Sequence, residues 1–192
     1  MFPIPQNYQR FKMLAIDPGL NNLGFSIFTF NNDFDHLVSV DPLTIVVDKE
    51  EGFFSFDETY HPDRLHKLLK IRQAVTAMIQ FHNPCIVVSE APFYNRLRPT
   101  AFRPLCEAIQ TLEIACYDCN PDIPFFQIPP LKVKQAVNAG STKGKIDVLT
   151  SIQQLPELLS KITVDITKLS DHAVDSIAVG HAYLTYFKGQ LK

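Results

Sequence analysis

Residues 13–30 of the chain, MLAIDPGLNNLGFSIFTF, set the architecture that the rest of the sequence completes. Residues 13–16 form a short apolar run, and residues 24–30 alternate in the way that a half-buried strand does. The turn-forming residues between them predict an antiparallel hairpin with Asp17 at the exit of its first strand. As a bare motif, Asp17-Pro-Gly19 is equally well explained as an ordinary turn.

Further strands and helices are expected outside this hairpin. Residues 85–89 are a continuous apolar run, which is typical of a buried central strand, and they end at Glu90. The complete expectation is strands at 13–16, 24–30, 37–47, 85–89 and 125–128, with helices at 63–81, 105–119, 132–137, 145–154 and 172–187. Because helices separate the later strands, we predict an α/β fold in which a mixed sheet of about five strands, the first three antiparallel, is flanked by helices.

Length and composition predict a single globular domain over residues 1–192, with an acidic excursion at about 31–60. The chain is 46% hydrophobic, which is enough for a sizeable core. No apolar run approaches the roughly 18 to 20 residues of a membrane span, and the first residues lack a signal-peptide pattern. Four cysteines are few for this length and favour reduced thiols. We therefore expect a soluble protein of the cytoplasm.

Charge is segregated along the chain, although the net charge is only −2. Residues 33–63 hold nine acidic residues and one base, Lys49, whereas residues 91–106 and 123–146 hold no acid at all. The two acid-free stretches are either phosphate-binding surfaces or ordinary solvated faces. The basic residues that are candidates for DNA binding are Arg96, Arg98, Arg103, Lys132, Lys134, Lys143 and Lys145.

Four side chains near strand or helix ends are candidates for a metal site. Asp17 and Glu90 each follow an apolar strand, so their carboxylates meet at one rim if the two strands are neighbours. His172 and Asp175 are three residues apart on the expected last helix and therefore share a face. Docking that face over the strand ends would assemble hard oxygen ligands that suit Mg²⁺, with Mn²⁺ as a substitute.

Each of these residues also has a simpler explanation. Glu90 can be a charge that ends a strand, and a lone His172 is more often a hydrogen-bonded residue than a metal ligand. We expect Asp171 to be the N-cap of the last helix rather than a ligand. The conjunction of candidates favours a site in which two ions, about 3.5 to 4 Å apart, activate a water against a phosphodiester. The product would then be a nick with a 5′-phosphate and a 3′-hydroxyl.

The candidates fall in four motifs that resemble those of the RuvC-like Holliday-junction resolvases, within the RNase H-like superfamily. The motifs occur in the family's order and span most of the chain. Each is weak alone, and the four together are fairly specific. They are Ile16-Asp-Pro-Gly19 followed by Gly24, Ser89-Glu90 followed by Phe93, Val133-Lys-Gln-Ala-Val137 followed by Lys145, and His172-Ala-Val-Asp175-Ser-Ile-Ala178.

The resemblance implies an RNase H-like sheet and a set of catalytic residues. Asp17, Glu90 and Asp175 match the family's catalytic carboxylates. His172 falls where members of the family carry either Asp or His. The resemblance therefore implies a Mg²⁺-dependent endonuclease whose metal ligands are these four residues.

The resemblance also implies how such a protein meets DNA. Lys134 and Lys145 match catalytic lysines near the scissile phosphate, where a cation neutralises charge in the transition state. Phe93 matches an aromatic residue that stacks on bases at the centre of a four-way junction. Members of the family act as homodimers that make paired symmetric cuts, which suits a junction whose two cleaved strands are also related by a two-fold axis.

The sequence departs from the bacterial pattern of this family in two places. The interval between Asp17 and Glu90 is longer than expected for bacterial members, and the excess falls in the acidic stretch, whose charge should keep it away from DNA. The arginines that follow Phe93 are also not a feature of that pattern. A divergent member is therefore expected, with a phage or a virus as a candidate source.

Other functions share parts of the pattern and remain alternatives. An RNase H-like nuclease for RNA or RNA–DNA hybrids, of the YqgF type, has the same acidic core. A non-cleaving junction-binding protein keeps the fold but has no need of all three carboxylates. Actin-like ATPases and sugar kinases have a phosphate loop similar to residues 17–24, but they need two such domains. The favoured prediction is a nuclease for Holliday junctions, with other branched DNA as further substrates.

Overall fold

The first three strands form an antiparallel meander, and two later strands extend it in parallel. The computed structural model describes residues 11–31, 36–47, 63–94, 96–97, 99–139 and 147–186. The strands are β1 (Phe11–Asp17), β2 (Asn22–Phe30), β3 (Leu37–Val46), β4 (Ile86–Glu90) and β5 (Phe125–Ile128). The α-helices are α1 (Asp63–His82), α2 (Phe102–Cys119), α3 (Pro130–Ala136), α4 (Val148–Gln153), α5 (Pro156–Leu159) and α6 (Asp171–Tyr186), with short 3₁₀ turns at Pro99–Ala101 and Ile166–Lys168.

The strand order β3-β2-β1-β4-β5 makes β1 and β4 direct neighbours. β1 pairs with β2 in antiparallel register, with Asp17 opposite Gly24. β1 also pairs with β4 in parallel, with Ile16 opposite Ser89. Asp17 and Glu90 therefore follow paired residues at the carboxyl edge of two adjacent strands. The predicted mixed sheet of five strands, with the first three antiparallel, is confirmed.

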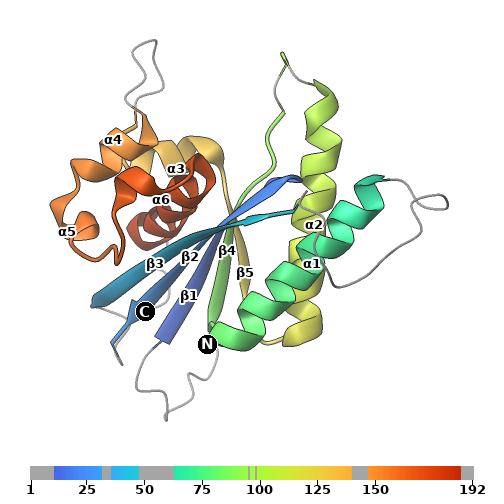
Figure 1. The fold of residues 1–192 in the computed structure, drawn as a ribbon, viewed down its shortest axis with the longest axis horizontal. Helices are drawn as coiled ribbons and strands as arrows, with labels where there is room; N and C mark the ends of the chain where they lie inside the picture. Colours follow the sequence, from blue (N-terminus) through green and yellow to red (C-terminus); the bar gives the residue numbers. More distant parts are fainter. Residues whose placement is uncertain are drawn as a thin grey trace.

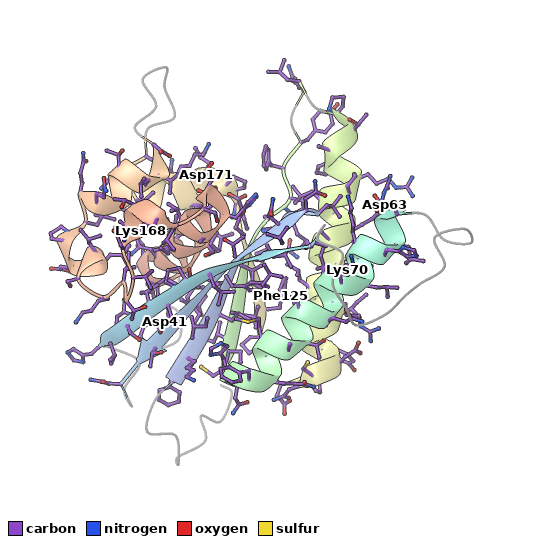
Figure 2. All side chains as sticks on the ribbon, viewed as in Figure 1. Asp41, Asp63, Lys70, Phe125, Lys168 and Asp171 are labelled. Atoms are coloured by element: carbon purple, nitrogen blue, oxygen red, sulfur yellow. The ribbon has the colours of Figure 1, made fainter. Side chains whose placement is uncertain are left out.

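Two layers of helices cover the sheet (Figure 1). α1 and α2 pack on one face, where Leu14 and Ile16 of β1 join one core cluster. α3 to α6 pack on the other face, where Met13 and Ala15 belong to a second cluster. Alternation along the strand explains this division, because successive side chains point to opposite faces. Figure 2 shows side chains filling both interiors, with Lys70 and Lys168 on the outside.

The structure corrects the expected beginning of two helices. α2 begins at Phe102, so Arg103 lies in its first turn and not in the preceding loop. Pro104 does not prevent this early start, because the first-turn N–H that proline lacks has no partner within a helix. α4 begins at Val148 after Asp147, while residues 140–146 lie outside the described part of the chain.

The N-cap predicted for the last helix was wrong by one residue. Ser170 Oγ accepts a hydrogen bond from the backbone N–H of Ala173 at 3.2 Å, and Asp171 is the first residue of α6. Serine and aspartate are both good N-cap residues, so the dipeptide itself does not distinguish them. Among the described helices, none is long and apolar enough to cross a membrane.

Candidate active site

α6 lies across β2 at a very small separation near its N-terminal end. A Cβ atom on Gly24 would stand 1.9 Å from the carbonyl oxygen of His172, so only glycine admits this approach. Two residues along the strand, Ser26 Oγ lies 2.6 Å from the buried Ser176 Oγ. Ser176 donates to the carbonyl oxygen of Ala173 at 2.7 Å. These contacts fix the first turns of α6 over the carboxyl edge of the sheet.

Asp17 and Glu90 point towards α6 because of their place in the strand alternation. Asp17 shares a face of β1 with Ala15, and Glu90 shares a face of β4 with Val88. Both Ala15 and Val88 belong to the core cluster beneath α6. The two carboxylates therefore meet the helix face that carries His172 and Asp175, as predicted from the sequence.

A short hydrogen bond joins two members of this cluster that come from opposite ends of the chain. His172 Nδ1 lies 2.6 Å from Asp17 Oδ2, and Asp17 is only 8% exposed. This bond raises the pKa of His172 above its usual value, against the opposing effect of burial. The bond favours the protonated form of the imidazole and orients the ring over the strand end.

The other two carboxylates hold protons more tightly than isolated acids do. Burial, followed by the charges of Asp17 and Asp175, raises the pKa of Glu90 to about 8, although Lys134 opposes the rise. Burial, followed by the charge of Asp17, raises the pKa of Asp175 to about 6. These mutual effects show that the three carboxylates are near one another. A cation bound among them would relieve this repulsion.

These four side chains suit a divalent cation chemically, but the hydrogen bond between Asp17 and His172 occupies a carboxylate oxygen that a metal would need. Carboxylate oxygens with one imidazole are ligands that Mg²⁺ and Mn²⁺ accept. Within the described ranges, no group of three or more carboxylate, imidazole or thiolate side chains stands in a geometry that could hold one ion. Asp17 Oδ2 instead bonds His172, so binding a metal there requires these side chains to rearrange.

Glu90→Gln is expected to remove a pH-dependent loss of stability in metal-free protein. The pKa of Glu90 is raised in the folded chain from a reference value of 4.5 to about 8. The folded state binds this proton more tightly than the unfolded state, so the free energy of unfolding falls as the pH rises through that window. In EDTA at about pH 8.5 the variant should melt roughly 5 °C above wild type, and near pH 4 the two should agree.

A thermal melt monitored by fluorescence measures this difference. Mg²⁺ at about pH 8.5 should raise the melting temperature of wild type and leave that of Glu90→Gln nearly unchanged. Glu113→Gln, which alters an exposed carboxylate on α2, is the matched control and should follow wild type. If wild type and Glu90→Gln have the same melting temperature at every pH, the pKa of Glu90 is not raised by burial and the neighbouring carboxylates.

The predicted lysines are not all placed at this site. Lys134 of α3 is exposed and close enough to Glu90 to lower its pKa. The Lys132 ammonium lies 4.4 Å from the centre of the Tyr186 ring, about 20 Å along α6 from His172. Lys143 and Lys145 lie outside the described residues. Lys134 is therefore the described lysine that the structure brings to the carboxylates.

The loop after Glu90 presents large side chains to solvent. Phe93 is 48% exposed and Tyr94 is 61% exposed. The Tyr94 ring contacts the Phe102 ring edge-on at 5.7 Å, which ties the loop to the start of α2. Arg96 is exposed in this loop, and Arg98 lies outside the described residues. An exposed phenylalanine beside the carboxylate edge fits the predicted base-stacking role, which stays a prediction.

Sequence reasoning missed several residues around the site. Asp147 raises the pKa of Asp175, and so does Asp171, which was expected only as a helix cap, so each adds negative charge near it. Ser26 and Ser176 join β2 to α6 from 150 positions apart, which no local pattern reveals. For Asp147, the available signal was an acidic residue immediately before a helix.

The fold and the site define an α/β protein with a carboxylate cluster at the edge of a mixed five-stranded sheet. The sequence is 27% identical over 183 residues to the crossover junction endodeoxyribonuclease RuvC of Cytophaga hutchinsonii, covering 94% of this chain and 78% of that protein. It is also 27% identical to RuvC of Chloroflexus aurantiacus, covering 90% of this chain and 93% of the relative. No family model matches the chain.

Solved structures of the same group share this fold. The Thermus thermophilus RuvC structure superimposes with a TM-score of 0.65 at 18% identity, covering 93% of this chain and 96% of the other. The yeast mitochondrial Holliday junction resolvase Ydc2 gives a TM-score of 0.60 at 14% identity, covering 98% of this chain and 85% of the other. The chain is therefore similar to RuvC proteins in sequence and in fold, as the sequence motifs predicted.

Proposed function

We propose that this chain is a Mg²⁺-dependent endonuclease that resolves four-way DNA junctions by paired hydrolysis of phosphodiesters. The observation that carries the proposal is the meeting of Asp17, Glu90, His172 and Asp175 where α6 crosses the carboxyl edge of β1 and β4. The RuvC relatives support it, since they are named crossover junction endodeoxyribonucleases. A T. thermophilus RuvC with a TM-score of 0.64 to this chain was solved with a Holliday junction substrate.

The side chains divide the work between metal binding and charge neutralisation. Asp17, Glu90 and Asp175 would hold the cations, with His172 as a fourth ligand. Two ions held there would supply an activated water on one side of the phosphodiester and would stabilise the leaving oxygen on the other. The Lys134 ammonium, placed near Glu90, would neutralise negative charge that develops on the phosphate. Cleavage leaves a 5′-phosphate and a 3′-hydroxyl.

Two copies of the chain are needed for the proposed paired cuts. A closed homodimer has a two-fold axis, and a four-way junction relates its two cleaved strands by the same symmetry. Each copy then places one carboxylate cluster on one strand, with Phe93 near the centre of the junction. Because the proposed substrate is intracellular DNA, we propose that the protein acts in the cytoplasm, including host cytoplasm if its source is a virus or a phage.

Cleavage of defined substrates tests the proposal. The full chain is incubated with a labelled four-way junction, a matched linear duplex and an RNA–DNA hybrid, with Mg²⁺, with Mn²⁺ or with EDTA. Symmetric cutting of the junction that requires the metal is the expected result. Cutting of the hybrid alone would favour a YqgF-type nuclease for RNA. Junction binding without cutting in either metal would favour a non-cleaving junction protein.

Phe93→Ala is expected to slow cleavage of a junction about tenfold, because one stacking contact contributes about 1 to 3 kcal/mol. The side chain is 48% exposed, so its truncation should leave the melting temperature within about 1 °C of wild type. Base opening is read from the fluorescence of 2-aminopurine at the junction centre.

The matched control for this variant is Phe81→Ala. Phe81 is 84% exposed near the end of α1, far along the helix from the carboxylate edge. Its replacement should change neither cleavage nor 2-aminopurine fluorescence. If Phe93→Ala and Phe81→Ala behave alike on a mobile junction, Phe93 has no stacking role.

A further inference from the structure

The N-terminal ends of α1 and α2 lie at the same edge of the sheet as the carboxylates. Each of these helices leads into a strand that begins at the opposite edge, β4 after α1 and β5 after α2. β1, β4 and β5 are parallel, so their carboxyl ends share one edge. Lys67, in the second turn of α1, donates to Asn21 Oδ1 at 3.0 Å, four residues after Asp17. The first turns of both helices therefore face the same side as the proposed active site.

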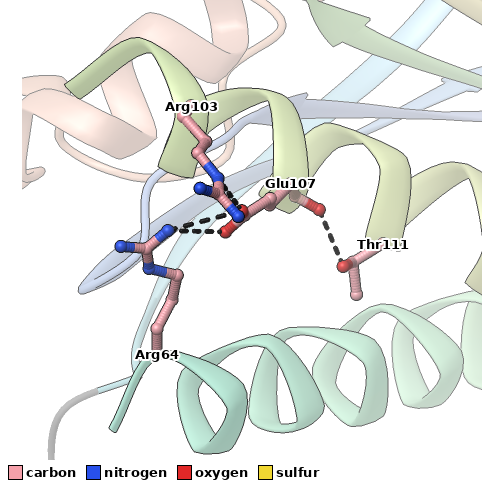
Figure 3. A network of polar contacts seen from close by, with 4 residues as sticks. All are labelled: Arg64, Arg103, Glu107 and Thr111. Carbon is pink, nitrogen blue, oxygen red and sulfur yellow. Dashed lines mark hydrogen bonds and ion pairs between the residues drawn. The ribbon is translucent and has the colours of Figure 1, made fainter. Parts of the chain in front are cut away.

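One carboxylate at this end of the molecule holds two guanidinium groups from different helices (Figure 3). Glu107 of α2 accepts from Arg103 Nε at 2.8 Å, one helical turn away. It also accepts from Arg64 Nη1 of α1, at 3.1 Å and 3.3 Å to its two oxygens. The hydrogen bonds from Arg103 and from Arg64 hold the pKa of Glu107 below its usual range, so it stays ionised at neutral pH.

This triad of Arg64, Arg103 and Glu107 carries a net charge of plus one. Its two arginines are exposed, Arg103 at 82% and Arg64 at 45%, while Glu107 between them is 27% exposed. Exposed ion pairs stabilise a fold by only about 0 to 1 kcal/mol, so stability alone is a weak reason for two arginines on one acid. Arg103 bonds Glu107 through Nε, and no hydrogen bond from its Nη atoms is present among the described residues, so these donors are available to a second anion.

The triad is joined to the exposed loop that carries Phe93. Arg103 directly follows Phe102, whose ring contacts Tyr94 at 5.7 Å, and Tyr94 directly follows Phe93. In the proposed function, a base at the junction centre stacks on Phe93. A duplex arm that leaves this base towards the start of α2 would then pass Arg103 and Arg64. Guanidinium groups bind phosphate oxygens in a planar two-point geometry that suits a DNA backbone.

We propose that Arg64 and Arg103, oriented by Glu107, form a phosphate-binding site for a duplex arm of the branched DNA substrate. The inference rests on the proposed function, because it names a further contact with the same substrate. It adds Arg64 of α1 to the DNA-contacting surface and gives Glu107, an acid beside DNA, the role of a positioning residue.

Equilibrium binding to a fluorescent four-way junction tests this site. Wild type, Arg64→Gln, Arg103→Gln and the double variant are titrated without Mg²⁺, in EDTA, at several salt concentrations. Each single variant should bind roughly fivefold more weakly near 0.1 M salt, and the slope of log K against log salt should fall by about one per arginine. The difference from wild type should shrink as salt is raised.

Arg72→Gln is the matched control because Arg72 also joins α1 to α2. Arg72 Nη2 bonds Asp118 Oδ2 at 2.6 Å near the far end of α2, and the arginine is 49% exposed. This variant loses a comparable ion pair but should keep wild-type affinity and salt slope. The melting temperature of every variant is also measured, so that a loss of stability is distinguished from a loss of binding.

The outcomes separate this inference from the function on which it rests. If wild type binds and cuts the junction while Arg64→Gln and Arg103→Gln bind as wild type does, the phosphate site is overturned and the nuclease proposal stands. The phosphate site is also overturned if Arg72→Gln weakens binding as much as Arg64→Gln and Arg103→Gln do. Loss of any ion pair between α1 and α2 would then explain the weaker binding. If wild type neither binds nor cuts a junction, the proposed function fails and the phosphate site fails with it.

Discussion

Asp17→Asn is expected to lower the rate of junction cleavage roughly a thousandfold while junction affinity in Ca²⁺ stays within about twofold of wild type. Asp17 is nearly buried, bonds His172, and raises the pKa of both Glu90 and Asp175. Asp17 thus interacts with each of the other three members of the cluster. Asparagine has the same shape but no charge, so the metal site loses a ligand and the basic surfaces remain.

Single-turnover cleavage with saturating enzyme measures the chemical step apart from binding. Asp122→Asn is the control, since Asp122 is exposed in the turn between α2 and β5 at the opposite edge of the sheet. It should cut at the wild-type rate. A normal rate for Asp17→Asn at saturation would show that the metal site has been assigned to the wrong residues.

Gly24→Ala is expected to destabilise the fold by at least about 3 kcal/mol and to abolish cleavage at temperatures where the chain is still folded. The added Cβ would stand 1.9 Å from the carbonyl oxygen of His172 and 3.2 Å from the backbone nitrogen of Ala173. Backbone atoms of a helix cannot rotate away, so α6 must move off β2. His172 and Asp175 move with it.

Gly180→Ala separates loss of stability from loss of the site. Gly180 lies on the same helix as His172, about 12 Å further along it. A Cβ atom on Gly180 would stand 2.1 Å from a ring carbon of Phe28. We expect it to lower the melting temperature as well, while cleavage by the folded fraction is retained. Thermal melts and cleavage assays on both variants provide the comparison. Equal cleavage by folded Gly24→Ala and wild type would contradict the docking argument.

The strands and the first two carboxylates were predictable because their signals are local. An apolar run predicts a buried strand wherever it occurs, and the residue that ends it lies at the edge of the sheet. Asp17 and Glu90 were therefore placed correctly once β1 and β4 were taken as neighbours. The spacing of His172 and Asp175 placed them on one helix face for the same local reason.

The helix start of α6 and the environment of the arginines were not predictable in this way. Ser170 and Asp171 are both good caps, and the choice depends on which backbone N–H each side chain reaches after folding. Arg103 belonged to an acid-free stretch in the sequence, yet it is paired with Glu107, which also holds Arg64 from a helix 43 positions earlier. Charge counted along a sequence does not report charge pairing across space.

The element order, the strand-end carboxylates and the likeness to RuvC resolvases follow from the amino-acid sequence, because short-range patterns of polarity encode them. The tertiary structure alone decided how closely α6 packs on the sheet and which hydrogen bonds form there. His172 reaches Asp17 across 155 positions, and Ser176 reaches Ser26 across 150. Such contacts depend on the close fit of Gly24 to a helix backbone, and the free energy of that packing is shared among residues that no local window contains.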